Sequence, residues 1–580
     1  MDKHQNKVGL VSAFRTAMIR VLLLGLWLAA GMPSSSVMVA MASDEDRDDG
    51  PVVRTADGPV RGFEQNQVFE FLGIPYAAPP VGALRWMPPQ PVKRWFEPLK
   101  ATAFKSNCPQ VTELGAFAGP SSINEDCLYL NVFTTQPGRG GKGSAVLVWI
   151  HGGGDVDGES NDYDARKLAT GGPLGTPTVV VTINYRLGLF GFLSEAHLNS
   201  EGHLWGNYGI MDQQAALRWV RANIAAFGGD PTRVALGGQS AGAYNTGANQ
   251  LSPLAAGLFN RAIYESSPGL FASLTSASAA LANGNAFAAA ADCSDAACLR
   301  SLSTARILQL QGTPNASAPY VTGVPLVDGT IIPRQPEAAW ISGNYNHMPI
   351  MGGSVRDELT FGGAITEYFS GPPQAPLTPD QYAAGVNAVW GTNASQVLAQ
   401  YPLSKYGNDT EVAFDRVSTD PILCRALHVL KRQAPSDGGN GVYAYDFTYP
   451  NAPYYFPKMP DPQSPTGNFQ ALASHTIDIQ FLFEDWHGGP LGVNLDQATG
   501  QPRELQGPEI GLSDQLVAAW TNFASIGNPN GSGAPNWPAF TTSSSTFLKE
   551  DIPNSVETEA QYRSFYQCDF WDPLLTYPTM

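Results

Sequence analysis

The clearest shortage in this 580-residue sequence is of charged side chains, which make up 15% of it, while 43% of the residues are apolar. A chain of this composition buries enough apolar surface to fold, which excludes intrinsic disorder. Positively charged residues are the scarcer kind: the sequence has 34 Lys and Arg but 51 Asp and Glu, which gives a net charge of -17. Nucleic acids and anionic membrane surfaces bind clustered cations, so we expect neither as a partner.

Metal-binding motifs and membrane-spanning runs are also missing. No C-x-x-C or H-E-x-x-H pattern occurs, so a zinc site has no support, and we expect neither a metal nor another cofactor. The apolar run VLLLGLWLAAG at 21–31 has eleven residues, whereas a helix needs about 20 to cross a bilayer. No later segment is long and apolar enough, so the sequence predicts no integral membrane segment.

The start of the chain has the order of a secretory signal peptide. Four basic residues precede the apolar run: Lys3, Lys7, Arg15 and Arg20. The triplet AMA at 40–42 then offers a small-x-small cleavage site before Ser43. We therefore predict that residues 1–42 are a signal peptide and that the mature protein is secreted or periplasmic. The alternative is an uncleaved amphipathic tail.

Six cysteines make disulfides the expected state in such a compartment: Cys108, Cys127, Cys293, Cys298, Cys424 and Cys568. Six cysteines allow 15 sets of pairs, and spacing singles out only the short loop CSDAAC, which joins Cys293 and Cys298. This loop lies in an Ala-rich stretch, 277–300, that predicts a helical insertion.

Four solidly apolar, β-branched segments are typical of strands buried on both faces of a sheet. They are AVLVWI at 145–150, TVVVTINY at 178–185, RVALGG at 233–238 and MPIMGG at 348–353. Near the start, residues 52–63 instead predict two short antiparallel strands around a turn-forming Asp-Gly pair.

Helical patterns alternate with these strands. Residues 209–227 place apolar side chains at helical spacing, and a second helix is expected at 513–526, from a capping Ser513 to Gly527. The alternation predicts an α/β protein whose central sheet is mostly parallel, with helices as crossovers.

The heptapeptide LGGQSAG at 236–242 contains a G-x-S-x-G pattern with Ser240 at its centre. It follows a predicted strand and precedes AGAYNTGA, which can begin a helix. This is the context of a nucleophile elbow, in which Gly238 and Gly242 leave room for a sharp turn that lifts the serine hydroxyl above the sheet edge. The alternative is a glycine-rich turn with a capping serine.

A second glycine-rich motif, WIHGGGD at 149–155, ends an earlier predicted strand. Successive glycines let backbone N–H groups point into a site, and an elbow serine needs a donor from such a loop to hold the oxyanion of a tetrahedral intermediate. A plain loop is the alternative, but the two motifs occur in the order that an elbow enzyme requires.

A nucleophilic serine also needs an acid and a base, which follow it in the chain in this class of enzyme. Two of the eight histidines, His475 and His487, come after all the predicted strands. Asp357 and Glu358 come directly after the strand at 348–353, where either is placed to orient an imidazole. The residues alone do not choose within either pair.

Four longer segments resemble the type-B carboxylesterase family, which includes cholinesterases and fungal lipases. They are FLGIPYAAPPVGALRWMPPQP at 71–91, EDCLYLNVF at 125–133, NYRLGLFGFL at 184–193 and GNYGIMDQQAALRWVRANIAAFGGDPTRVALGGQSAGA at 206–243. The resemblance implies an α/β-hydrolase fold: a large, mostly parallel sheet flanked by helices, with an N-terminal antiparallel part and helical insertions over the active site. Residues 43–580 would form this one catalytic domain.

The same resemblance implies roles for individual residues. The catalytic residues would be Ser240, Glu358 and His475. The oxyanion donors would be the backbone N–H groups of Gly153, Gly154 and Ala241. A serine that supports the acid would be Ser266. The disulfides would pair Cys108 with Cys127, Cys293 with Cys298, and Cys424 with Cys568.

Three positions depart from the family's usual pattern. An acid normally precedes the nucleophile, an aromatic residue follows the oxyanion glycines and a glycine follows the acid; here these residues are Gln239, Asp155 and Leu359. Asp155 would disfavour anionic substrates, and Gln239 should weaken the attraction for cationic alcohol groups. Residues 109–126 lack the tryptophan that cholinesterases use for choline, so choline esters are not the expected substrate.

The resemblance therefore implies a serine carboxylic ester hydrolase that forms an acyl-enzyme with small neutral esters, short-chain or aryl. An interfacial lipase is the first alternative, with a lid supplied by 109–126 or by the long Pro-rich loop expected at 451–469. A non-catalytic adhesion or binding protein on the same fold is the second. Such proteins typically lose the nucleophile or its base, and here both are present.

Overall fold

The computed structural model of the protein describes residues 50–111, 120–138, 143–266, 273–311, 325–369, 375–434, 441–465, 467–487, 493–531 and 533–575. The predicted signal peptide, residues 1–42, lies outside this part of the chain. Within the described ranges, no helix is both long and apolar enough to cross a membrane.

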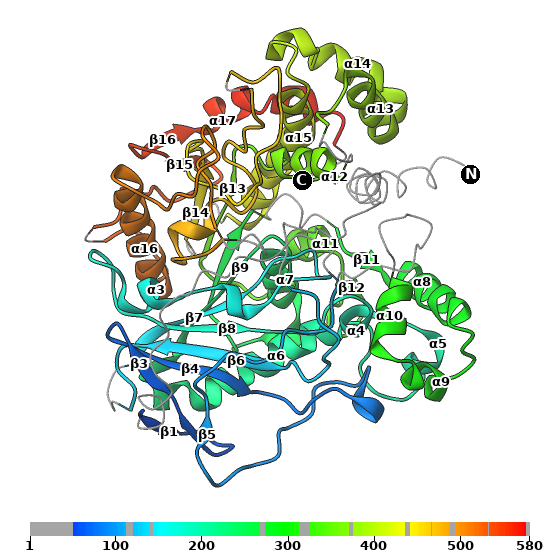
Figure 1. The fold of residues 1–580 in the computed structure, drawn as a ribbon, viewed down its shortest axis with the longest axis vertical. Helices are drawn as coiled ribbons and strands as arrows, with labels where there is room; N and C mark the ends of the chain where they lie inside the picture. Colours follow the sequence, from blue (N-terminus) through cyan, green and yellow to red (C-terminus); the bar gives the residue numbers. More distant parts are fainter. Residues whose placement is uncertain are drawn as a thin grey trace.

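A large central sheet organises the molecule (Figure 1). Eleven strands of the described chain form it, in the order β16 (Ser555–Thr558), β15 (Thr546–Glu550), β14 (Val442–Phe447), β13 (Ile350–Val355), β10 (Arg261–Glu265), β9 (Gly229–Gln239), β7 (Ser144–Ile150), β8 (Val179–Ile183), β6 (Tyr129–Thr134), β4 (Val68–Pro75) and β3 (Phe63–Gln65). Neighbouring strands from β15 to β8 are parallel, whereas the pairs at both edges are antiparallel. The mostly parallel sheet predicted from the sequence is thus confirmed.

The predicted strands all occur. The four buried segments form β7, β8, β9 and β13, and the antiparallel pair at the start forms β1 (Val52–Arg54) and β2 (Pro59–Arg61). The pair belongs to a separate small sheet, which β5 (Leu99–Lys100) completes. A two-stranded sheet joins β11 (Thr275–Ser276) and β12 (Leu326–Val327).

Helices surround the sheet (Figure 1). In the described chain they are α3 (Arg166–Thr170), α4 (Gly188–Phe192), α5 (Ala196–Asn199), α6 (Tyr208–Asn223), α7 (Ala241–Leu251), α8 (Ala277–Ala290), α9 (Ala296–Ser301), α10 (Thr304–Gln311), α11 (Pro336–Ser342), α12 (Thr360–Phe369), α13 (Pro379–Trp390), α14 (Ala394–Gln400), α15 (Thr410–Gln433), α16 (Pro508–Ile526), α17 (Glu559–Phe565) and α18 (Cys568–Trp571).

Side chains of β7 alternate between two hydrophobic cores, one on each face of the sheet. Val146 and Val148 share a core with apolar residues of α6 and α7. Leu147 and Trp149 share the other core with residues of α3 and α16. Because both faces are covered, every residue of β7 after Ser144 is buried, which explains its unbroken apolar sequence.

The two helices expected from periodicity are present, one with a different start. The first is α6, which continues as a short 3-10 turn to Phe227. The second, α16, ends at Gly527 as predicted but begins at Pro508 rather than after Ser513. Ser513 is buried, and its hydroxyl donates a hydrogen bond to the carbonyl of Phe481 at 2.6 Å, so it is a packing residue inside the helix.

The Ala-rich stretch forms α8 and α9, which confirms the helical insertion; with α10 these helices lie on one side of the molecule, away from α13 to α15 (Figure 1). The segment 451–469 contains no helix or strand among its described residues, as expected of a long loop.

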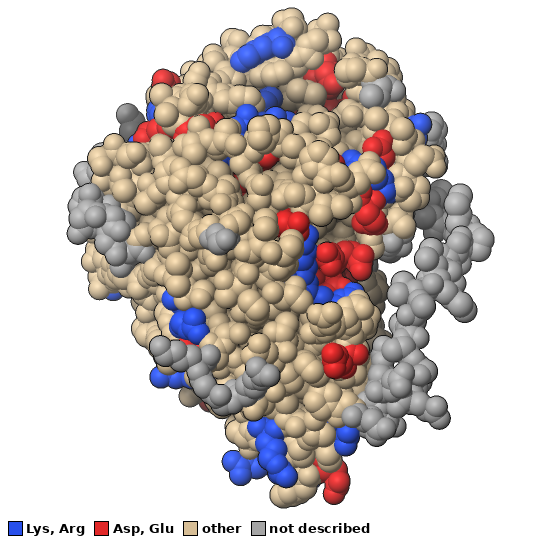
Figure 2. Space-filling model, turned by 90° about the vertical axis from the view of Figure 1, so that its left-hand side faces the viewer, with Lys and Arg blue, Asp and Glu red and all other residues tan. Residues whose placement is uncertain are grey.

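On the face shown in Figure 2, charged side chains form small groups of both signs separated by wide uncharged areas.

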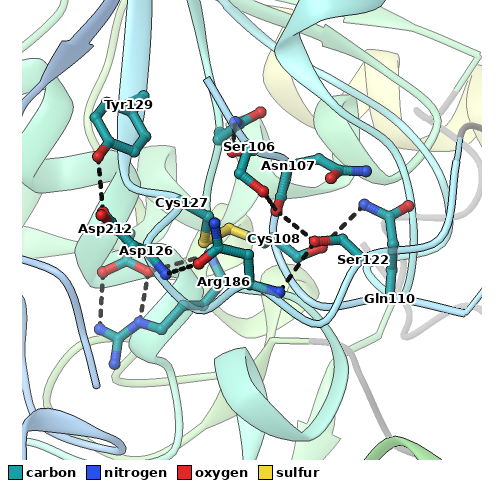
Figure 3. Close-up of a disulfide and its surroundings, with 12 residues drawn as sticks. Ser106, Asn107, Cys108, Gln110, Ser122, Asp126, Cys127, Tyr129, Arg186 and Asp212 are labelled. Carbon is teal, nitrogen blue, oxygen red and sulfur yellow. Dashed lines mark hydrogen bonds and ion pairs between the residues drawn. A yellow bond between two sulfur atoms is a disulfide. The ribbon is translucent and has the colours of Figure 1, made fainter. Parts of the chain in front are cut away.

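Three disulfides cross-link the chain, Cys108–Cys127, Cys293–Cys298 and Cys424–Cys568. In the loop that the first one closes, Ser122 Oγ donates to the carbonyl of Asn107 at 3.0 Å (Figure 3). Gln110 of the same loop accepts the N–H of Gly158 at 2.8 Å and donates to its carbonyl at 3.0 Å. The disulfide loop is therefore hydrogen-bonded to the segment that follows the three glycines at 152–154.

Candidate active site

Ser240 lies in a sharp turn between β9 and α7. Its backbone has φ 56° and ψ -121°, a strained conformation for a residue with a side chain and one found at nucleophile elbows. The turn is held on both sides, because the N–H of Ser240 donates to the carbonyl of Glu265 and the carbonyl of Ser240 accepts the N–H of Tyr244, each at 2.9 Å.

Close packing under the turn explains its glycines. A Cβ atom on Gly242 would lie 2.0 Å from the carbonyl oxygen of Ile150 on β7. A Cβ atom on Gly238 would lie 2.5 Å from the same oxygen. Any side chain at either position would push α7 away from the sheet and move Ser240.

His475 and Glu358 meet beside this turn. The imidazole Nδ1–H of His475 donates to Glu358 Oε2 at 2.5 Å. The other carboxylate oxygen, Oε1, accepts the N–H of Val355 at 3.1 Å. Two hydrogen bonds therefore fix the carboxylate, and the carboxylate fixes both the orientation and the tautomer of the imidazole.

Asp357, the neighbouring acid, has a different role. Its carboxylate pairs with Arg356 at 2.8 Å and with Arg416 of α15 at 3.2 Å. It also accepts the N–H of Ala473 at 3.0 Å, which ties the turn after β13 to the segment before His475. Asp357 thus holds the two segments together, while Glu358 faces the imidazole.

The other candidate base, His487, lies elsewhere, as do two further histidines. His487 Nε2 is 3.4 Å from Glu504 Oε1, and His428 lies within α15 near Glu337. Burial lowers the pKa of His151 to about 4, so this imidazole is uncharged at neutral pH.

Gln239 contacts the same imidazole from the opposite side. Its side-chain Nε2 lies 3.2 Å from His475 Nε2, and the residue is 1% exposed. Sequence reasoning assigned Gln239 a place beside the nucleophile but missed this contact, because the two residues are 236 positions apart.

The candidate oxyanion donors have free N–H groups. Gly153 and Gly154 have φ values of 102° and 63°, and Ala241 is the first residue of α7. In the described chain, none of the three N–H groups donates a hydrogen bond to another group. The first N–H groups of a helix have no partner within it, so Ala241 is suited to bind a negative oxygen.

Asp155 does not present its charge to a substrate, contrary to the sequence-based expectation. Its carboxylate is buried, and Oδ1 accepts hydrogen bonds from Tyr185 Oη at 3.2 Å and from Asn245 Nδ2 at 2.7 Å. The left-handed backbone of Asp155, φ 64°, accompanies this inward direction. We therefore no longer expect Asp155 to repel anionic substrates.

Ser266 follows β10 with φ 59°, and its N–H donates to the carbonyl of Gly353 at 2.9 Å. The resemblance implied that its hydroxyl supports Glu358. In the part of the chain that the structure describes, this buried Oγ makes no hydrogen bond.

Two further carboxyl groups lie under the site, and sequence reasoning missed them. Burial raises the pKa of Glu265 well above its usual value, and the negative charge of the neighbouring Asp478 raises it further. Burial also raises the pKa of Asp478. Asp478 lies three residues after His475, a spacing that offered a signal for it, whereas Glu265 is brought there by the pairing of β10 with β9.

Aromatic side chains form an apolar wall next to the imidazole. The ring centroid of Phe361 lies 5.7 Å from that of His475, and that of Phe456 lies 5.8 Å from Phe361. Phe361 comes three residues after Glu358 in RDELTF, and Phe456 belongs to the long loop at 451–469. Such a wall is suited to an apolar acyl or alcohol group.

Comparison with known proteins decides the family. The model of the carboxylesterase family matches residues 49–571. The chain belongs to the carboxylesterase family. This carboxylesterase is 33% identical over 539 residues to liver carboxylesterase 1 of Oryctolagus cuniculus, which covers 84% of this chain and 88% of that protein. It is 32% identical over 568 residues to carboxylesterase 1E of Mus musculus, with 90% and 92% covered.

Solved structures agree with this assignment. A thermophilic PNB esterase matches the carboxylesterase with a TM-score of 0.69 at 29% identity, covering 89% of this chain and 99% of that chain. The carboxylesterase EST55 of Geobacillus stearothermophilus matches with a TM-score of 0.68 at 30% identity and the same coverage. The predicted α/β-hydrolase fold is confirmed, and the protein is a carboxylic ester hydrolase.

Proposed function

We propose that the enzyme uses Ser240 as nucleophile, His475 as general base and Glu358 as the acid that orients the base. The observation that supports this most strongly is the 2.5 Å contact between His475 Nδ1 and Glu358 Oε2 beside the turn that carries Ser240. It leaves Nε2 of the imidazole as the atom that can accept a proton.

The reaction then follows from these groups. His475 takes the proton of Ser240 as the Ser240 oxygen attacks the ester carbonyl. The N–H groups of Gly153, Gly154 and Ala241 hold the resulting oxyanion. The alcohol leaves with the proton from His475, and an acyl-enzyme remains. Water, activated by the same imidazole, releases the acid and restores Ser240. In these steps the chain supplies the nucleophile, the base, the orienting acid and the oxyanion donors, and the ester and water are the reactants.

We propose small neutral carboxylic esters, short-chain or aryl, as substrates. The aromatic wall of Phe361 and Phe456 is apolar, and Gln239 is neutral where the family usually carries an acid. The neutral side chain of Gln239 supplies no negative charge to attract a cationic alcohol such as choline.

The long loop at 451–469 bears on the lipase alternative. An interfacial lid must detach from the body of the protein. In this loop Tyr454, Tyr455 and Met459 are 1% exposed and belong to the hydrophobic core that includes α3 and α16. Detaching them would expose three large apolar side chains, which favours an esterase without a lid in this loop.

We propose that the enzyme is secreted or periplasmic. The six cysteines of the described chain all lie in disulfides, and none is free. Disulfides persist in oxidising compartments, which fits the signal peptide predicted at 1–42.

Hydrolysis of a panel of p-nitrophenyl and aryl esters by the wild-type enzyme and by Ser240→Ala tests the proposal. We expect the wild type to prefer short acyl chains and the variant to lose essentially all activity. Equal hydrolysis by both proteins would show that the nucleophile is wrongly assigned. Activity that rises with acyl length above the solubility of the ester would support the lipase instead.

A further inference from the structure

The contact between Gln239 and His475 has a consequence for the resting enzyme. Gln239 is the last residue of β9, directly before the nucleophile, and its amide Nε2 lies 3.2 Å from His475 Nε2. That ring nitrogen is the one that must accept the proton of Ser240 in the proposed mechanism.

The contact that His475 makes through Nδ1 determines which group donates in the hydrogen bond at Nε2. Because Nδ1–H of His475 is committed to the carboxylate of Glu358, the uncharged ring has only a lone pair at Nε2. The amide N–H of Gln239 can donate to that lone pair, whereas its oxygen could not. The oxygen instead faces Gly152, where it lies 2.9 Å from the position a Cβ atom would take.

One lone pair in the plane of the ring accepts one good hydrogen bond. In the described chain, no hydrogen bond joins Ser240 Oγ to His475. We infer that Gln239 is a positioning residue that occupies the base in the resting enzyme, so that His475 must exchange Gln239 for Ser240 before proton transfer. This inference rests on the proposed function, because it assumes that Ser240 and His475 react.

The exchange affects the ground state and the transition state differently. The amide N–H stabilises the uncharged imidazole, but it cannot donate to the imidazolium, whose Nε2 carries a proton. The contact therefore slows the reaction and also favours the uncharged ring over the charged one. The acidic groups near the ring are Glu358, which contacts Nδ1, and Asp478, which interacts with the ring electrostatically; both act in the opposite direction, and Glu265 interacts in turn with Asp478.

The variant Gln239→Met removes the donor while keeping a side chain of similar length. We expect its plateau kcat/KM for a neutral aryl ester to rise about two- to tenfold, and the acid limb of the kcat/KM profile to move up by about 0.5 to 1 pH unit. Gln239→Glu, whose ionised carboxylate cannot donate either, should move the acid limb in the same direction. Gln396→Met, the same change at an exposed position on α14, is the matched control and should alter neither quantity.

The rate at which a fluorophosphonate modifies Ser240, measured from pH 5 to 9, separates the possible outcomes. The inference is supported if the wild-type enzyme is labelled at Ser240 and Gln239→Met is labelled faster than the wild type. A folded Gln239→Met whose plateau does not rise, or whose acid limb does not move, overturns the inference and leaves the proposed function intact. If this variant does not fold, an unmoved acid limb in Gln239→Glu overturns it. Wild-type enzyme that is not labelled at Ser240 overturns the proposed function itself.

Discussion

Replacing Glu358 by glutamine should leave the fold intact and put the imidazole proton on the wrong nitrogen. Glu358 Oε1 accepts the N–H of Val355 at 3.1 Å, while Oε2 faces His475 Nδ1 at 2.5 Å. The amide oxygen of glutamine can replace only one of these acceptors. With the oxygen on Val355, the amide N–H turns to Nδ1, which then becomes an acceptor, and the ring proton moves to Nε2. No lone pair remains there for the proton of Ser240.

We expect kcat of Glu358→Gln to fall about 10⁴-fold with little change in KM, because a wrong tautomer removes the base and leaves the binding surfaces in place. Steady-state hydrolysis of a p-nitrophenyl ester measures both constants. Thermal unfolding of the same samples shows whether the variant is folded.

Asp357→Asn is the matched control on the neighbouring residue. It weakens the contacts with Arg356 and Arg416, so we expect about 1.5–3 kcal/mol less free energy of unfolding and a kcat close to that of the wild type. Wild-type kcat in Glu358→Gln would refute the reasoning. So would an equal loss of kcat in a folded Asp357→Asn.

Three further predictions concern charge and stability. Replacing Cys424 and Cys568 together by serine should lower the free energy of unfolding by about 4–5 kcal/mol in urea titrations, because the disulfide closes a loop of sequence separation 144; an unchanged midpoint would contradict this. Gln239→Glu should raise the selectivity for cationic over neutral esters by about tenfold, and an unchanged ratio of kcat/KM values would exclude a charge effect there. Burial raises the pKa of Glu411 to about 8 and of Glu367 to about 9, whereas carboxyls of the unfolded chain titrate near 4.3. The folded state therefore holds more protons, and stability should fall between pH 5 and 8 by about 1 kcal/mol per pH unit for each carboxyl, a slope that Glu367→Gln should reduce.

Local sequence was sufficient to predict the sheet and the elbow. The unbroken apolar residues of β7 reflect burial on both faces, and the glycines around Ser240 are required where α7 passes close to Ile150. These features depend on the backbone and on nearest neighbours, so they are visible in a short stretch of chain.

Contacts between distant segments could not be predicted in the same way. The side chain of Ser513 resembles a helix cap, but it finds a hydrogen-bond acceptor on another segment, at Phe481. Asp357 and Glu358 are chemically similar neighbours, and only the placement of Arg416 and His475 separates their roles.

The identity of the nucleophile is the central claim, and peptide mapping after reaction with a fluorophosphonate tests it most directly. We expect one covalent adduct per chain, on Ser240, in the wild-type enzyme and none in Ser240→Ala. His475→Ala should be folded and label far more slowly, because its serine has no base. An adduct on another serine, or labelling of Ser240→Ala at the wild-type rate, would contradict the account.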